Sequence, residues 1–345
     1  MALYPLLLEP IYKEKVWGGR TLERFGRTLP GGPTTLVGES WELVDLAATS
    51  PSGGGGEPAH SVVRNGPLIK RLLNDVLDRF GPLVTGSLDV GAAGGFPLLL
   101  KYLDARENLS VQVHPSPEYA RDHADAHLKS EAWYIVAADP GAVIYKGVRP
   151  GTTPEEFAAA IEADTVPELL ATVPARVGDC HYLPSGTCHA LGAGILVAEV
   201  QTASDTTFRV YDWGRTDREL HIEPALACID FGSVAPADAA EPGGALESTV
   251  RGEALGRLLV DCDHFAIREW KLLRKAKLSV ESNELSALMF IDGTGAVEWG
   301  GEQTQSLPIT SGDTVLLPAA LERADIVADT DLTVLEITPP AAADQ

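Results

Sequence analysis

The sequence predicts a mainly β protein built from two β-barrel units with a small helical insertion. Most of the 345 residues fall into short apolar or alternating runs separated by glycine and proline, which number 34 and 24. Only three stretches place apolar residues at helical spacing. A motif of Gly-Asp, four further residues and Pro occurs at residues 178–184 and again at 312–318. This internal repeat predicts that the two units are related.

The three predicted helices all lie in the first two thirds of the chain. The first is expected near residues 65–82, where an apolar stripe ends at a Gly-Pro pair. The second is expected near residues 153–173, because Thr153 and Glu156 have the spacing of a capping box. A third, weaker helix is expected near residues 223–229.

Composition shifts predict the domain boundaries. Residues 1–232 form the first unit, residues 233–249 are rich in Ala, Pro and Gly and read as a linker, and residues 250–345 form a smaller β unit. Residues 48–60, with four consecutive glycines, are expected to be a loop. The second copy of the repeated motif is not followed by a histidine, so only the first unit is expected to hold a metal.

Charge and cysteine content exclude several classes of function. Against 49 acidic residues there are 27 Lys and Arg, a formal charge of −22, which disfavours nucleic-acid and anionic-membrane partners. The opening apolar run is short and broken by Pro5 and Glu9, so neither a signal peptide nor an anchor is expected. The cysteines form no CxxC pair, which predicts a reduced, cytoplasmic protein; they are Cys180, Cys188, Cys228 and Cys262.

Candidate metal ligands stand on two predicted strands. Residues 109–114 alternate, so Ser110, Gln112 and His114 share one face, which suits either a metal site at a barrel mouth or a half-exposed edge strand. His189 follows a Gly and Pro pattern that bends a strand and directs an imidazole into a barrel. Glu131 precedes a strongly apolar run and is the candidate carboxylate; its alternative is a surface residue at a strand end.

Five linked motifs carry a family resemblance. They are FPLLLKYLDA at 96–105, LSVQVHP at 109–115, KSEAWY at 129–134, LPSGTCHALGAGILVAEVQ at 183–201 and SDTTFRVYDW at 204–213. With WGG at 17–19 and GESWE at 38–42, they make the chain similar to type I phosphomannose isomerases, especially the short bacterial form. The resemblance covers most of residues 4–232 and implies cupin (jelly-roll) barrels. The C-terminal part resembles a degenerate cupin only weakly.

The resemblance implies one metal ion per chain, normally zinc, although another divalent metal would fit. Its implied ligands are Gln112, His114, Glu131 and His189, and Arg209 is the implied active-site arginine. On residue type alone, Arg209 has the alternative of pairing with one of the neighbouring acids Asp205 and Asp212.

Further candidates sit in apolar surroundings or near the metal motifs. Lys101 lies within an apolar run and is either snorkelling or buried with a lowered pKa; Glu199 interrupts another such run and meets a cation or has a raised pKa. Both are candidate acid/base groups. Ser110 and Lys129 are the candidate phosphate contacts, and Trp17 of the WGG motif is assigned to the substrate.

These residues predict a metal-dependent aldose–ketose isomerase acting on mannose 6-phosphate and fructose 6-phosphate through an enediol. Each step develops negative charge on oxygen, which a metal and an arginine stabilise. Two alternatives are an iron-dependent cupin dioxygenase and a non-catalytic sugar-sensing cupin. Among the other histidines, His181 is expected to be packed, and His123 and His127 to lie in a solvated segment. The sequence leaves the oligomeric state open.

Overall fold

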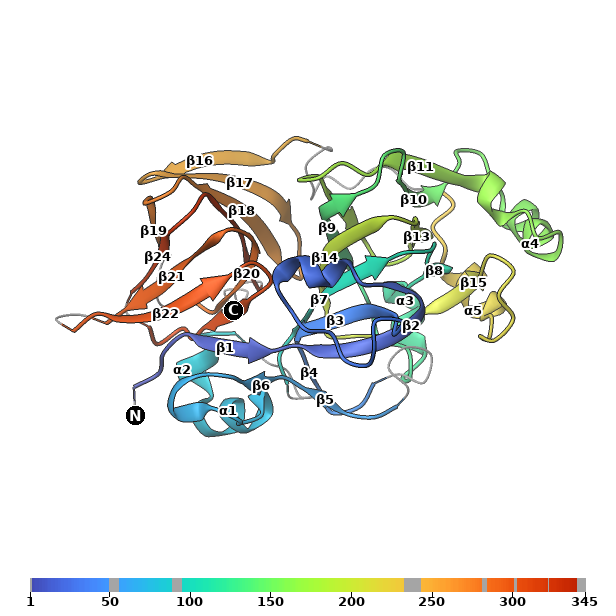
Figure 1. The fold of residues 1–345 in the computed structure, drawn as a ribbon. Helices are drawn as coiled ribbons and strands as arrows, with labels where there is room; N and C mark the ends of the chain where they lie inside the picture. The colour runs from blue at the N-terminus through green and yellow to red at the C-terminus, as the bar shows by residue number, and fades with distance from the viewer. Residues whose placement is uncertain are drawn as a thin grey trace.

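The protein folds into two β-barrels that lie side by side (Figure 1). The computed structural model describes residues 2–49, 56–88, 95–232, 243–280, 284–300, 303–321 and 323–339. The predicted mainly β class is confirmed, since short antiparallel strands are the predominant secondary structure and helices are few. Among them, no helix combines the length and apolar character needed to span a bilayer.

The first barrel consists of two facing antiparallel sheets. One runs in the order β12 (Cys180–Leu183), β9 (Glu131–Ala138), β14 (Ile195–Thr202), β7 (Leu98–Ala105), β2 (Ile11–Gly19) and β3 (Val37–Leu43). The other runs in the order β11 (Leu170–Pro174), β10 (Val143–Val148), β13 (His189–Leu191), β8 (Val111–Val113) and β15 (Phe208–Tyr211). Both sheets carry predicted site residues: Gln112, His189 and Arg209 lie on the second, and Trp17, Lys101, Glu131 and Glu199 lie on the first.

The second barrel repeats this arrangement. Its larger sheet has the order β16 (Glu247–Arg251), β17 (Ala254–Asp261), β18 (Ala266–Leu272), β25 (Leu332–Thr338), β20 (Ser286–Asp292), β23 (Thr314–Leu317), β1 (Leu6–Glu9) and β6 (Val62–Val63). Its smaller sheet has the order β19 (Lys277–Val280), β24 (Ala324–Ala328), β21 (Thr294–Trp299) and β22 (Gln305–Thr310). A two-stranded pair, β4 (Asp45–Leu46) and β5 (Ala59–His60), completes the strands described.

The repeated motif marks the same structural element in both barrels. Gly178 and Gly312 each adopt φ of 89°, a left-handed conformation that glycine permits, directly before β12 and β23. β12 pairs with β9 as β23 pairs with β20, and β14 lies between β9 and β7 as β25 lies between β20 and β18. The internal repeat predicted from Gly-Asp-x4-Pro is therefore confirmed by strand order.

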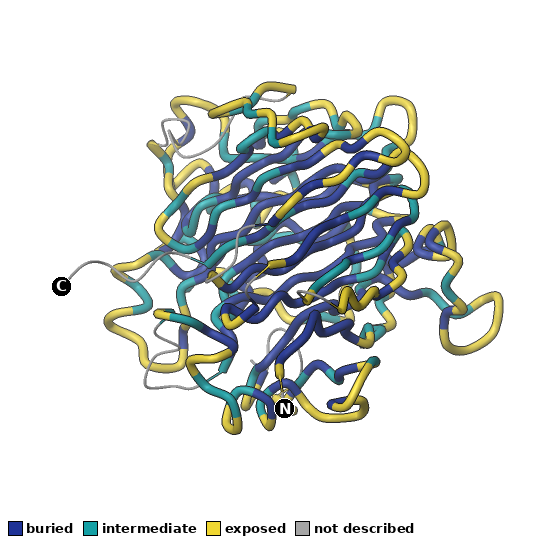
Figure 2. Tube along the Cα trace, turned by 90° about the vertical axis from the view of Figure 1, so that its left-hand side faces the viewer, coloured by how far each residue is buried: buried dark blue, intermediate teal, exposed yellow. Residues whose placement is uncertain are grey.

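The two barrels share one hydrophobic core. The faces of β9 and β14 that point away from their own barrel pack against the corresponding faces of β20 and β25, and contribute residues such as Tyr134, Ala198, Met289 and Leu335. In Figure 2 the buried residues run along the strands, while exposed residues gather in the loops. Polar contacts cross the same junction: Tyr134 Oη donates to Glu269 Oε1 at 2.6 Å.

The first predicted helix is shorter than expected. A 3-10 turn, η2 (Gly66–Leu68), comes first, and Lys70 has φ of 65°, which interrupts any continuous helix. The helix α1 (Leu73–Phe80) therefore begins in the middle of the apolar stripe, and α2 (Pro82–Thr85) follows it directly. The stripe is buried against the rest of the fold at Leu68, Leu73 and Val76 rather than along one helix.

The second and third helices begin where expected. Thr153 and Glu156 form the predicted capping box before α4 (Pro154–Glu162). The helix ends sooner than residue 173, since η3 (Val166–Leu169) and then strand β11 follow. The remaining helical segments are α5 (Ile222–Cys228), α3 (Pro117–Asp122) and η1 (Thr21–Phe25).

The division of the chain into a first unit that ends at residue 232 and a second that begins at residue 250 remains our proposal. The strand pairing differs from this division at two places. Residues 6–9 and 62–63 lie in the first unit by sequence, yet β1 pairs with β23 and with β6 in the sheet of the second barrel. Of the predicted linker, residues 233–242 lie outside the described part of the chain, and residues 247–251 form β16. Residues 50–55 of the predicted loop also lie outside it.

Candidate metal centre

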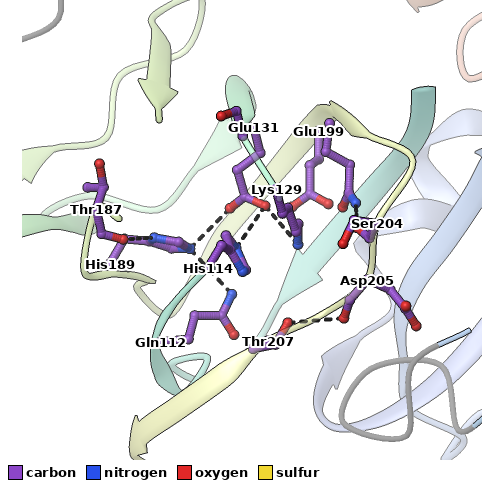
Figure 3. A network of polar contacts seen from close by, with 12 residues as sticks. Gln112, His114, Lys129, Glu131, Thr187, His189, Glu199, Ser204, Asp205 and Thr207 are labelled. Carbon is purple, nitrogen blue, oxygen red and sulfur yellow. Dashed lines mark hydrogen bonds and ion pairs between the residues drawn. The ribbon is translucent and has the colours of Figure 1, made fainter. Parts of the chain in front are cut away.

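The three strands β8, β9 and β13 bring the predicted metal ligands together. Gln112 on β8 pairs with His189 on β13, and Glu131 begins β9 opposite Leu183 of β12. His114 follows the end of β8. Figure 3 shows His114, His189 and Lys129 converging on the Glu131 carboxylate, with the Gln112 amide beside His189.

The ligand atoms are close and buried. Nε2 of His114 lies 3.2 Å from Oε2 of Glu131, and Nε2 of His189 lies 3.1 Å from Oε1. Nε2 of Gln112 is 3.4 Å from Nε2 of His189. The two histidines are 1% exposed and Glu131 is 0% exposed. Among the described residues, His114, Glu131 and His189 are the group of His, Cys, Asp or Glu close enough to hold one metal ion.

Backbone carbonyls orient both imidazoles. The Nδ1 atom of His114 lies 3.0 Å from the Thr206 oxygen, and Nδ1 of His189 lies 2.8 Å from the Thr187 oxygen. With Nδ1–H donating to a carbonyl, each ring leaves Nε2 free as a metal ligand. Burial, together with the charge of Lys129, lowers the pKa of His114 to about 3, so its imidazole is in the neutral, ligating form.

The charge of the cluster also suits a cation. Burial disfavours the Glu131 carboxylate, but Lys129 and His114 hold the pKa of Glu131 well below its usual range. Both Glu131 oxygens and Nε2 of His114 are buried and make no hydrogen bond among the described residues, although Oε2 has an ion pair with Lys129 at 2.9 Å. Such unsatisfied acceptors at the meeting point of three ligands are satisfied by a divalent metal ion. The residues present therefore fit a metal centre.

Lys129 lies closer to the metal ligands than its predicted phosphate role implied. Its Nζ atom is 2.9 Å from Oε2 of Glu131, and the residue is 4% exposed. It also lines the large cavity beside the metal ligands, so its contact with substrate stays a prediction.

Lys101 and Glu199 form a buried ion pair on neighbouring strands. They lie opposite each other on β7 and β14, with Nζ 3.2 Å from Oε1 of Glu199 and 2.8 Å from Oε1 of Gln201. Trp133 Nε1 donates to the other Glu199 oxygen at 2.9 Å. Burial alone would lower the pKa of Lys101, but Glu199 and Glu39 raise it above its usual value. Lys101 is buried as one of the two alternatives proposed, but the expectation of a lowered pKa is wrong.

Arg209 stands beside the metal centre on β15, where it pairs with Gln112 of β8. Its Nη1 donates to the Glu219 carbonyl at 2.8 Å, and its Nε is buried without a partner among the described residues. Asp212, one of the two acids that could have neutralised it, is engaged by Arg215 and Arg218. Burial lowers the pKa of Arg209, and the nearby Arg218 lowers it further.

A cavity of about 710 Å³ joins these residues. It is lined by all three predicted catalytic residues, by all three predicted substrate-binding residues and by one metal ligand: Lys101, Glu199, Arg209, Trp17, Ser110, Lys129 and Gln112. Trp17 and Ser110 are each 3% exposed. The structure thus gathers residues from several strands and loops around one cavity large enough for a small molecule.

Sequence reasoning missed Glu39 and His221. Glu39 lines the cavity, accepts from Trp41 Nε1 at 2.7 Å and pairs with Lys15 at 3.1 Å. Although burial acts in the opposite direction, Lys15 and Lys101 lower the pKa of Glu39 to about 2. Glu39 is part of the GESWE motif. The alternation of polar and apolar residues within one strand could not show that Glu39 lies near Lys101, which belongs to another strand.

The remaining histidines lie as follows. His221 lines the cavity, with Nδ1 3.4 Å from the Arg209 backbone nitrogen. His123 is exposed and stacks on Tyr119, with ring centroids 3.8 Å apart, and His127 is exposed. His181 is 1% exposed inside the first barrel, as the expectation of a packed residue requires.

The fold and the site define a metal-binding protein of two cupin barrels, whose ligand cluster among the described residues lies in the first barrel. The family model for the catalytic domain of type I phosphomannose isomerase matches residues 6–140. Mannose-6-phosphate isomerase ManA of Bacillus subtilis is 37% identical over 331 residues, which cover 93% of this chain and 95% of that protein. The chain belongs to the type I phosphomannose isomerase family.

Solved structures agree with this assignment. The crystal structure of the mannose 6-phosphate isomerase from Bacillus subtilis has a TM-score of 0.82 and 30% identity, and the match covers 96% of this chain and 99% of that one. A zinc-bound mannose 6-phosphate isomerase has a TM-score of 0.70 at 16% identity, covering 97% and 99% of the two chains. That second likeness shows a shared fold.

Proposed function

We propose that the chain interconverts mannose 6-phosphate and fructose 6-phosphate with one zinc ion bound by Gln112, His114, Glu131 and His189. The observation that carries the proposal is a buried His-Glu-His cluster next to Gln112 and Lys129, two residues that line the same cavity as the Lys101–Glu199 pair. Family membership supplies the substrate, since the curated relatives are named for this reaction.

Zinc suits the ligand set, because two neutral imidazoles, a carboxylate and an amide oxygen are ligands it accepts while keeping a position open. When bound, the ion is a Lewis acid that stabilises negative charge on substrate oxygen. Gln112, one of the proposed ligands, lines the cavity in which the substrate would bind.

The protein's own groups supply the proton transfer. Aldose–ketose isomerisation moves one proton from carbon 2 to carbon 1 through an enediol. Glu199 Oε1, which lies 3.2 Å from the Lys101 ammonium, is positioned to take and return that proton. Trp133 holds the second oxygen of Glu199 and so fixes the direction of the carboxylate.

Cations in the cavity bind the anionic parts of the substrate. Arg209 carries an Nε that has no partner in the described part of the chain, and a permanent charge suited to the enediolate or the phosphate. Ser110 and Lys129 are the further proposed phosphate contacts, and Trp17 forms one wall of the cavity. Because Lys129 also contacts Glu131, its removal is expected to affect both phosphate and metal.

Two alternative functions receive no support from the relatives. An iron-dependent dioxygenase or a non-catalytic sugar sensor would share the barrel and its ligands, yet the curated relatives and solved structures cited above are isomerases by name. The charged Lys101–Glu199 pair also has no role in binding an oxygen-activating metal.

The test is metal content together with isomerase activity on mannose 6-phosphate, before and after chelation. His189→Ala is the test variant and His264→Ala, in the second barrel, is its matched control. The proposal expects about one zinc per chain and turnover that is lost on chelation and in the His189 variant but kept in the control. Metal without turnover would favour a sensor or a dioxygenase, and a metal-free active enzyme would refute the ligand assignment.

A cytoplasmic location completes the proposal. The four cysteines are free thiols, three of them buried, as expected for a protein of a reducing compartment.

A further inference from the structure

The mouth of the second barrel corresponds residue by residue to the catalytic mouth of the first. Glu131 pairs with Leu183, and Ser286 pairs with Leu317, the matching residue of the repeated motif. Ser286 therefore stands in the position of the metal-ligating carboxylate. With no carboxylate there and no histidine in β19 or β24, this mouth has lost the metal ligands.

The cation and carboxylate of the first mouth persist in the second. Lys101 lies opposite Glu199 on β7 and β14, and Arg268 lies opposite Glu336 on the matching strands β18 and β25. By the same register, Thr338 stands where Gln201 stands in the first barrel. Four polar residues thus face one another at the second mouth.

In the second mouth, the charged groups are held apart and leave a space between them. Arg268 has an ion pair with Glu247 at 3.8 Å, while Glu336 Oε2 accepts from Trp270 Nε1 at 2.7 Å. A cavity of about 160 Å³ opens there, room for about five water molecules. Its lining residues are Arg251, Leu258, Ala266, Arg268, Glu284, Ser286, Glu336 and Thr338.

Two donors in this cavity lack partners among the described residues. Nη1 of Arg268 and Oγ of Ser286 are both buried and unsatisfied, and Ser286 is only 3% exposed. A buried donor without a partner is costly, so a ligand with acceptor oxygens would stabilise both.

The charges of the lining decide the chemistry of that ligand. Arg251 and Arg268 are balanced by Glu284 and Glu336, in a protein of formal charge −22. An anion would meet two carboxylates, whereas neutral hydroxyl groups both accept from Arg268 and Ser286 and donate to Glu336. We propose that the mouth of the second barrel is a binding site for a small neutral polyol with adjacent hydroxyl groups. The proposal is independent of the reaction in the first barrel.

The indole N–H of Trp270 reports on this site directly, because it donates to Glu336. Titration of the full-length protein with erythritol, followed by the ¹H–¹⁵N signal of Trp270, tests the proposal, with the signal assigned from Trp270→Phe. A saturable shift of the Trp270 signal, without a parallel shift of the active-site indoles of Trp17, Trp41 and Trp133, is expected. Butane-1,4-diol, which lacks adjacent hydroxyls, and inorganic phosphate should produce no saturable shift.

A double variant and its control complete the test. Arg268→Gln with Ser286→Ala should weaken erythritol binding at least about tenfold, while isomerase activity is unchanged. Arg274→Gln, an exposed arginine beyond the far end of β18, should bind like the wild type. If the double variant fails to fold, the erythritol titration of the wild-type protein still tests the proposal. No saturable shift with erythritol, a shift with phosphate alone, or equal affinity in a folded double variant would overturn the proposal.

Discussion

The Nζ atom of Lys129 lies 2.9 Å from Oε2 of Glu131, so the buried carboxylate of the proposed metal site is also the partner of a buried ammonium. The contact joins the substrate cavity to the metal centre, because Lys129 lines the cavity and Glu131 meets both histidines. Changes on either side of this pair should therefore have separable effects on metal content and on substrate choice.

Glu131→Gln should reduce bound metal and activity together. The amide keeps the shape but loses the charge that offsets a divalent cation, and it leaves Lys129 without its partner. We expect metal affinity and kcat/KM to fall by at least about 100-fold. Metal analysis after gel filtration and isomerase assays measure both. Ser286→Ala, at the matching position of the second barrel, is the control and should retain both; full metal occupancy in Glu131→Gln would contradict the assignment.

Lys129→Met should change the preference for phosphorylated sugar. If Lys129 contacts phosphate, kcat/KM falls more for mannose 6-phosphate than for free mannose, by about 10- to 100-fold. Metal content measured on the same sample separates this loss from damage to the Glu131 contact. A variant that keeps its metal and its discrimination would transfer the phosphate role to Arg209, whose Nε has no partner among the described residues.

Glu199→Gln and Lys101→Met should lower turnover more than affinity. Because we propose that these two groups handle the transferred proton, we expect kcat to fall by about 10²–10⁴-fold with a small change in KM. Exchange of the substrate carbon-2 hydrogen with deuterated solvent gives a second readout of the same step. Both variants break a buried ion pair, so thermal unfolding must accompany the kinetics. Unchanged turnover in both would remove the pair from the mechanism.

His181 should make the fold sensitive to acid. Burial, with a further effect of Lys146, lowers the pKa of His181 to about 4, while an unfolded histidine titrates near 6.5. Between these values the unfolded state binds more protons, so stability falls as pH falls from about 6.5 to 4, by on the order of 3 kcal/mol. His181→Gln should remove this component.

Denaturant unfolding across this pH range gives the free energy of unfolding of wild type and variant. In the difference between the two proteins, the contributions of the other titrating groups cancel. His127→Gln, at an exposed position, should leave the wild-type slope intact. Parallel curves for wild type and His181→Gln would show that His181 does not titrate in this range.

Local patterns in the sequence predicted the elements and the ligand set. The alternation of residues 109–114 placed Gln112 and His114 near one face, and the capping box at Thr153 predicted the start of α4. Both predictions use the regular spacing of side chains along a strand or a helix, and this spacing is set by residues that are close in sequence. The apolar stripe before Gly81 led to a wrong prediction of one continuous helix. Its residues are divided between the 3-10 turn η2 and the helix α1.

Residue types and local patterns were sufficient to predict the β class, the internal repeat and the chemical groups of the site. Three features required the folded protein: β1 joins the sheet of the second barrel, the pKa of Lys101 is raised rather than lowered, and Glu39 contributes to that rise. Strand pairing and electrostatics depend on partners that are distant in the chain, so local patterns do not reveal them. The Lys101 ammonium is kept charged by Glu39 and Glu199, which are 62 and 98 residues away in sequence.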